Sequence, residues 1–99
     1  MVKIKKIKEK SRGEQFRAIL GGMGVRLEDC RVLCFTFEKE RGAENFHYDL
    51  MREIALPYFI FDAAGNDAYI VMPIMKPKAV SAVERLASLA GGVAKVPEL

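Results

Sequence analysis

The strands expected in this chain are apolar on both faces, and this restricts the folds that the chain can adopt. Successive residues of a strand point to opposite faces of a sheet. In the expected strand 31–39, Leu33 and Phe35 therefore share one face, while Val32 and Cys34 share the other. The other safe strands, Tyr58–Phe61 and Ala68–Met75, are also apolar at consecutive positions. A solvated antiparallel sheet alternates apolar with polar residues, so a sheet of these strands must be covered on both sides.

A short helix is expected at residues 12–22, ahead of the strands. Ser11 and Glu14 fit a capping box, in which the two side chains bind backbone N–H groups at the start of a helix. The glycine cluster at 21–24 supplies the stop, because glycine tolerates the left-handed conformation that follows a helix. The apolar residues at helical spacing are Phe16, Ile19, Leu20 and Met23.

The segment 46–54 has two interpretations. Its apolar residues alternate at every second position, as in a strand, but Phe46, Leu50 and Ile54 also fit one helical stripe. The polar residues 40–45 before it are expected to form a turn. We expect a strand over 46–54, because aromatic residues flank a turn of hairpin type.

A second helix is expected to start at Pro77, because proline is favoured at the first helical position. Gly91 and Gly92 end it, and residues 93–99 are expected to form a tail. The 99 residues are therefore predicted to form a single α+β domain. The domain is expected to contain an antiparallel meander of about four strands, with the N-terminal and C-terminal helices covering one face. Residues 2–8 are expected to add a short strand or an ordered arm.

Two modest helices cover about one face of such a sheet, so another group must cover the second face. Another subunit, a ligand or the N-terminal arm folded back would do so. Exposed apolar patches larger than a few hundred Å² usually mark contact sites. We therefore expect a homo-oligomer, either a dimer or a tetramer.

Positive charge is concentrated at the start of the chain, above all in residues 1–12. Residues 1–26 carry eight basic and two acidic side chains, a net charge of +6, whereas residues 27–99 carry a net charge of −3. A Lys or Arg that neutralises a phosphate releases condensed counterions, so a basic arm favours nucleic acid. The alternative is a solvated basic strand and helix face. The candidate phosphate contacts are Lys3, Lys5, Lys6, Lys8, Lys10, Arg12, Arg17 and Arg26.

Four aromatic side chains are candidates for stacking on unpaired bases. Each base stacked on an exposed ring contributes about 1–3 kcal/mol. Tyrosine suits a half-wet site because it combines an apolar ring with a polar hydroxyl. The alternative is that these rings belong to the core or to a subunit interface. The four candidates are Phe46, Tyr48, Tyr58 and Tyr69.

Catalytic and metal-binding motifs are not recognised in the sequence. The glycine cluster at 21–24 lacks the spacing of a phosphate-binding loop. Cys30 and Cys34 have no second cysteine pair, and His47 is the only histidine, so a four-ligand zinc site within one chain would need carboxylates. We expect no catalytic residues, no metal and no cofactor. A small-ligand or enzyme site assembled between subunits is the remaining alternative.

The sequence thus predicts a non-enzymatic homo-oligomer that binds nucleic acid, in particular single-stranded DNA or RNA. A cytoplasmic location without membrane contact is expected, because two cysteines fit a reducing compartment and no stretch reaches the roughly 18 apolar residues of a membrane span. The alternative function is a protein–protein interaction or scaffold subunit, in which lysines only maintain solubility. The aromatic signature of RNA-recognition sheets, the KH loop and zinc-finger spacings are absent.

Overall fold

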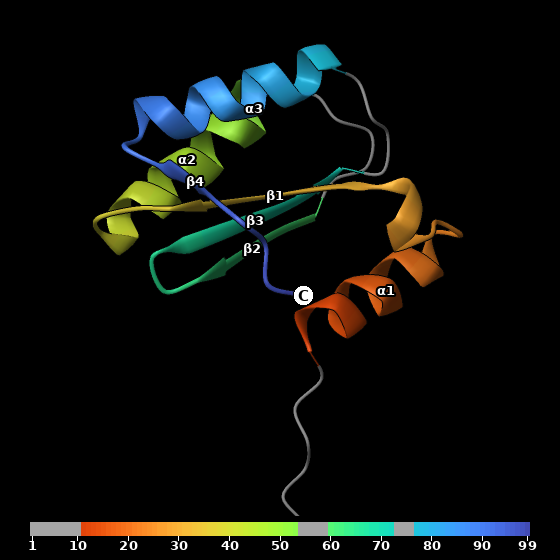
Figure 1. Cartoon of the computed structure of the whole chain (residues 1–99). Helices are drawn as coiled ribbons and strands as arrows, with labels where there is room; N and C mark the ends of the chain where they lie inside the picture. The colour runs from red at the N-terminus through yellow and green to blue at the C-terminus, as the bar shows by residue number, and fades with distance from the viewer. Residues whose placement is uncertain (1–10, 54–59, 73–76) are drawn as a thin grey trace, which may run out of the picture.

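The computed structural model describes residues 11–53, 60–72 and 77–99. Three helices and a four-stranded antiparallel sheet form in this part of the chain, which confirms the α+β class (Figure 1). The elements are α1 (Arg12–Gly22), the short 3-10 helix η1 (Leu27–Asp29), β1 (Arg31–Thr36), α2 (Glu40–Glu53), β2 (Ile60–Ala64), β3 (Asp67–Met72), α3 (Pro77–Leu89) and β4 (Val93–Lys95). The predicted strand at 2–8 and residues 58–59 and 73–75 of two others lie outside the described residues.

The strands lie in the order β2-β3-β1-β4, so β1 and β2 are separated by β3. They do not follow one another in chain order as in a meander, because α2 carries the chain over the sheet from β1 to β2. From β1 to β4 the element order is βαββαβ, the split βαβ arrangement of ferredoxin-like domains. Helix α1 precedes this unit as an additional element.

The prediction of a turn at 40–45 followed by a strand at 46–54 is wrong, because residues 40–53 form α2. Its buried residues Ala43, Phe46 and Leu50 are spaced at three and four positions, so the helical stripe describes the segment. Gly42 sits inside this helix where a Cβ would lie 3.1 Å from the carbonyl oxygen of Ala90. This glycine permits a close approach of the chain after α3 rather than a turn.

Helices α2 and α3 cover one face of the sheet and build the larger part of the core. Phe35 of β1 and Ile70 of β3 pack there against Phe46 of α2 and Leu86 of α3. Phe37, which follows β1, belongs to the same cluster. This agrees with the expected division of β1 into two apolar faces. In Figure 1 the two helices form one layer above the sheet.

Helix α1 covers the opposite face, which corrects the prediction that the N-terminal and C-terminal helices share a face. Phe16 and Leu20 of α1 pack with Cys34, Tyr69 and Val71 in a second apolar cluster. The physical reason is that α2, absent from the sequence prediction, fills the first face beside α3 and leaves α1 free for the second. The uncovered second face that led us to expect an oligomer is therefore covered in large part by the chain itself.

The predicted tail at 93–99 is also corrected, because its first three residues form β4 and pair with β1. Gly91 has a φ of +83° and its N–H donates to Ser88, while the N–H of Gly92 donates to Ala87. These two bonds form a Schellman motif, which ends α3 and turns the chain back onto the sheet. A Cβ on Gly92 would lie 2.6 Å from the Phe37 ring, so only glycine fits here without displacing this core side chain.

The described helices also bear on the expectation about membranes. None of those in residues 11–53 or 77–99 combines the length and the apolar character needed to cross a membrane.

Candidate nucleic-acid interface

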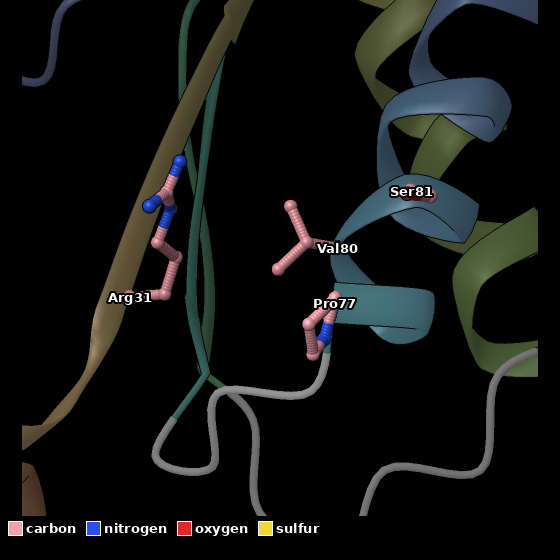
Figure 2. Close-up of a pocket in the computed structure, with 4 residues that line it drawn as sticks. All are labelled: Arg31, Pro77, Val80 and Ser81. Carbon is pink, nitrogen blue, oxygen red and sulfur yellow. The ribbon is translucent and has the colours of Figure 1, made fainter.

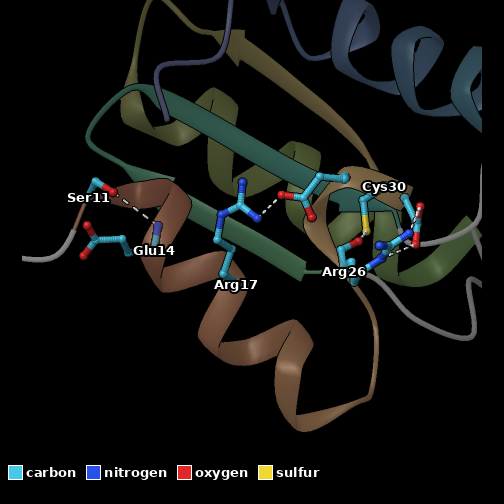
Figure 3. Close-up of polar contacts among 7 residues, drawn as sticks. Ser11, Glu14, Arg17, Arg26 and Cys30 are labelled. Atoms are coloured by element: carbon cyan, nitrogen blue, oxygen red, sulfur yellow. Dashed lines mark hydrogen bonds and ion pairs between the residues drawn. The ribbon is translucent and has the colours of Figure 1, made fainter.

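The three described arginines of the basic set are each paired with a carboxylate of the same chain. Arg12 pairs with Asp62, and Arg17 pairs with Glu28. The Nε of Arg26 lies 3.1 Å from a carboxylate oxygen of Asp29 (Figure 3). The charges of these three arginines are therefore partly neutralised within the fold.

Arg12 is the most firmly held of the three. Its guanidinium lies 4.1 Å from the centre of the Tyr69 ring, which is the geometry of a cation–π contact. It also pairs with Asp62 on β2, and its side chain is only one-quarter exposed. These contacts tie the start of α1 to β2 and β3, so Arg12 positions the helix against the sheet.

The other two pairs lie at the surface. Both side chains of the Arg17–Glu28 pair are more than half exposed, and so are those of the Arg26–Asp29 pair. The hydrogen bond from Arg17 holds the pKa of Glu28 below its usual range, and the bond to Asp29 raises the pKa of Arg26. Exposed ion pairs contribute little to stability, so a phosphate can compete for these arginines.

The five candidate lysines, at positions 3 to 10, lie outside the described residues. The structure describes where their segment joins the body, at the start of α1. The Ser11 Oγ accepts a hydrogen bond of 3.2 Å from the backbone N–H of Glu14, as the capping box predicts for this side chain. A Cβ on Gly13 would lie 3.4 Å from the Cβ of Leu99, so the start of α1 lies close to the C-terminal residue.

Two of the four candidate stacking rings are buried. Phe46 is 0% exposed and its ring centre lies 5.6 Å from those of Phe35 and Phe37. Tyr69 is 3% exposed and is covered by Arg12. Neither ring offers a face to a base in this conformation.

Tyr48 is 67% exposed and remains available, whereas Tyr58 lies outside the described residues. Tyr48 belongs to α2, on the face of the sheet opposite α1 (Figure 1). The fold therefore separates this ring from Arg12 and Arg17 rather than bringing them together.

A buried polar contact lies beneath α1. Burial raises the pKa of the Cys34 thiol, and a hydrogen bond with Tyr69 opposes part of this shift. Burial also raises the pKa of Tyr69, and its hydrogen bond with Cys34 raises that pKa further. Both groups are therefore held in their neutral forms at neutral pH, which is the chemistry of a structural contact rather than of a nucleophile.

The two cysteines are expected to differ in their reactivity with iodoacetamide at pH 8. Cys34 is 3% exposed, whereas Cys30 is half-buried and its thiol donates a hydrogen bond to the Arg26 carbonyl. Burial raises the pKa of both thiols, so both react slowly, and access makes Cys34 at least tenfold slower. Mass spectrometry of the alkylated peptides measures the two rates, and urea-unfolded protein is the control. Equal rates in the native protein would contradict the burial of Cys34 beneath α1.

Two neighbouring cavities share Arg31 of β1 as a lining residue. One, of about 330 Å³, is lined by Arg31, Pro77, Val80 and Ser81 (Figure 2). The other, of about 350 Å³, runs from Arg31 past Glu84 to Pro97. Each is lined by residues that are distant in the sequence, so no local sequence pattern indicates them.

The described residues bring together no group of three or more His, Cys, Asp or Glu side chains able to hold a metal ion. No known protein family, curated protein or solved structure matches the chain, so its function has to be inferred from its own residues.

Proposed function

We propose that this protein is a cytosolic, non-enzymatic nucleic-acid-binding protein whose basic N-terminal segment contacts phosphates. One observation carries the proposal: residues 1–10 hold five lysines and one glutamate, while the described body holds twelve acidic and ten basic side chains. A polyanion is attracted to the segment and not to the body. The body is the folded domain to which this segment is joined at Ser11.

The burial of Phe46 and Tyr69 alters how binding is expected to work. Bases are therefore not expected to stack on these two rings, and binding is expected to depend on contacts between basic side chains and phosphates. Such contacts fix position but carry no sequence information. We therefore expect binding to single-stranded DNA or RNA with little dependence on sequence and a strong dependence on salt.

Fluorescence anisotropy with a labelled single-stranded oligonucleotide, at several salt concentrations, tests this proposal. Each phosphate neutralised on a single strand contributes about −0.7 to the slope of log K against log salt. A variant with all five lysines of residues 1–10 changed to glutamine is expected to bind at least tenfold more weakly and with a flatter slope. Absence of binding by the natural chain at low salt would overturn the proposal.

A matched control removes the same charge from the body. Five exposed basic side chains have no ion pair within the part of the chain that the structure describes, and all five are changed to glutamine. They are Arg31, Lys39, Arg41, Lys78 and Arg85. This variant is expected to keep most of the affinity. An equal loss in both variants would show that net charge, and not the segment, controls binding.

Self-association is a second candidate function, because exposed apolar side chains gather near β4. Leu89, Val93, Val96 and Leu99 are each at least half exposed. β4 is an edge strand, and exposed edges are templates for pairing with another chain. Light scattering of the natural chain and of Val93→Lys tests this candidate. A monomeric mass at every concentration would remove it.

A further inference from the structure

The first residue of β1 places a positive charge in a row of core positions. Phe35 belongs to the core cluster under α2 and α3, and Leu33 packs against that cluster. Alternation along the strand puts Arg31 on the same face as these two residues. β4 pairs with residues 34–36 alone, so within the described residues the start of β1 has no strand on that side. Arg31 therefore lies at the open end of the layer between the sheet and α3 (Figure 2).

One side of α3 forms the wall opposite this arginine. Pro77, Val80 and Ser81 line the cavity of about 330 Å³ together with Arg31. They are spaced as i, i+3 and i+4, so they share one side of the helix. The wall is thus mainly apolar, with one hydroxyl. Small-molecule sites usually have this form, and the volume lies at the lower end of their range.

The charge of Arg31 is not balanced by a carboxylate in the described part of the chain. The ion pairs formed among residues 11–53, 60–72 and 77–99 do not include Arg31. Segments 54–59 and 73–76, which follow α2 and β3 in the chain, contain no Asp or Glu. A guanidinium without a counter-ion attracts an anion, and its planar donors match a carboxylate.

The neighbouring cavity limits the charge of such an anion. Glu84, one helical turn after Val80, lines that cavity together with Arg31. Lys95 belongs to the same lining, but its Nζ lies 2.8 Å from a carboxylate oxygen of Asp67. In the described lining, an unpaired arginine and a nearby carboxylate favour a ligand with a single negative charge. A second negative charge would be repelled by Glu84.

We propose that the cavity between β1 and α3 binds a small organic acid in its carboxylate form. The carboxylate pairs with the guanidinium of Arg31 in a bidentate geometry. The hydrocarbon body of the ligand packs against Pro77 and Val80, which removes apolar surface from water. This inference goes beyond the proposed function, because it needs neither nucleic acid nor the lysines of residues 1–10. Either can fail without the other.

NMR titration of the isotope-labelled full chain with hexanoate tests the site. Hexanoate joins one carboxylate to a short hydrocarbon body, and a ligand of so few atoms is expected to have a dissociation constant on the order of 1 mM. Saturable shifts are expected at the amides of residues 31–33 and 78–81. Hexanamide keeps the body without the charge, and acetate keeps the charge with almost no body. Both, and inorganic phosphate, are expected to bind at least tenfold more weakly.

Two arginine variants remove the same charge from different places. Arg31→Gln is expected to weaken hexanoate binding at least tenfold, because it removes a charge-assisted hydrogen bond. Arg85→Gln is the matched control, since Arg85 is an exposed residue of α3 outside the described lining of both cavities. It is expected to bind hexanoate as the natural chain does. Arg31→Gln is also expected to keep its affinity for oligonucleotides, which separates this site from residues 1–10.

Val80→Phe is the second test, because it fills the cavity without a change of charge. Loss of hexanoate binding in Val80→Phe and Arg31→Gln, with Arg85→Gln unaffected, supports the site. Equal loss in the two arginine variants overturns it, because general attraction between charges then explains the binding. Hexanamide or phosphate binding as tightly as hexanoate overturns the proposed ligand class. Absence of saturable shifts well above the expected dissociation constant also overturns the proposal.

Discussion

Replacing Phe46 with alanine is expected to lower the free energy of unfolding by about 3–5 kcal/mol. Phe46 is 0% exposed and its ring contacts those of Phe35, Phe37 and Phe61. Truncation removes buried apolar surface and leaves a cavity between α2 and the sheet, since a packed core relaxes only in part. The loss is a large fraction of the stability of a small domain, which is about 5–15 kcal/mol.

Urea unfolding followed by circular dichroism measures this effect. Tyr48→Ala is the control, because Tyr48 lies on the same helix and is 67% exposed. We expect its effect to stay within about 0.5 kcal/mol. A stable Phe46→Ala protein that has lost affinity for oligonucleotides would contradict the core role and restore this ring as a binding residue.

Replacing Leu20 with alanine is expected to cost about 2–5 kcal/mol. Leu20 is 0% exposed and belongs to the cluster that joins α1 to Cys34, Tyr69 and Val71. The variant therefore measures how strongly α1 covers the second face of the sheet. A weakened α1 also uncovers apolar strand residues, so increased binding of a hydrophobic dye is expected.

Ile19→Ala is the matched control for this variant, because Ile19 is the adjacent residue of α1 and is 50% exposed. We expect it to cost well under half as much as Leu20→Ala. Equal effects of the two substitutions would mean that α1 does not pack on the sheet in solution. The second face would then be free for another subunit, in line with the homo-oligomer that the sequence predicts.

Local signals in the sequence located α1, β1 and α3 well. Ser11 and Glu14 predicted the start of α1, and the observed helix spans the expected residues 12–22. Pro77 predicted the start of α3. The alternation of β1 correctly assigned Phe35 to one apolar cluster and Cys34 to the other. Each of these depends on residues close together in the chain.

The errors arose where distant contacts decided the structure. Gly42 resembles a turn residue, but it serves as a point of close approach within α2. Residues 93–95 carry little strand signal and become β4 because β1 offers them an edge. The order of the strands likewise follows from how α2 and α3 pack, which no single segment encodes.

The candidate site was predicted in part. The charge of residues 1–12 is evident in the sequence, but the carboxylate partners of Arg12, Arg17 and Arg26 are seen only in the structure. Asp62 and Glu28, the partners of Arg12 and Arg17, are distant in the sequence, so residue spacing does not indicate them. Aromatic character alone likewise did not distinguish buried Phe46 from exposed Tyr48, because burial depends on which side of α2 faces the sheet.

The polarity of this chain follows from its amino-acid sequence alone: a cationic start, followed by segments whose apolar residues require burial on two sides. What covers each side follows from the packing of elements that are far apart in the sequence. Helices α2 and α3 cover one face and α1 the other, because three helices together bury more apolar surface than two. That arrangement also fixed which rings are enclosed, which arginines are paired and which edge of β1 stays open.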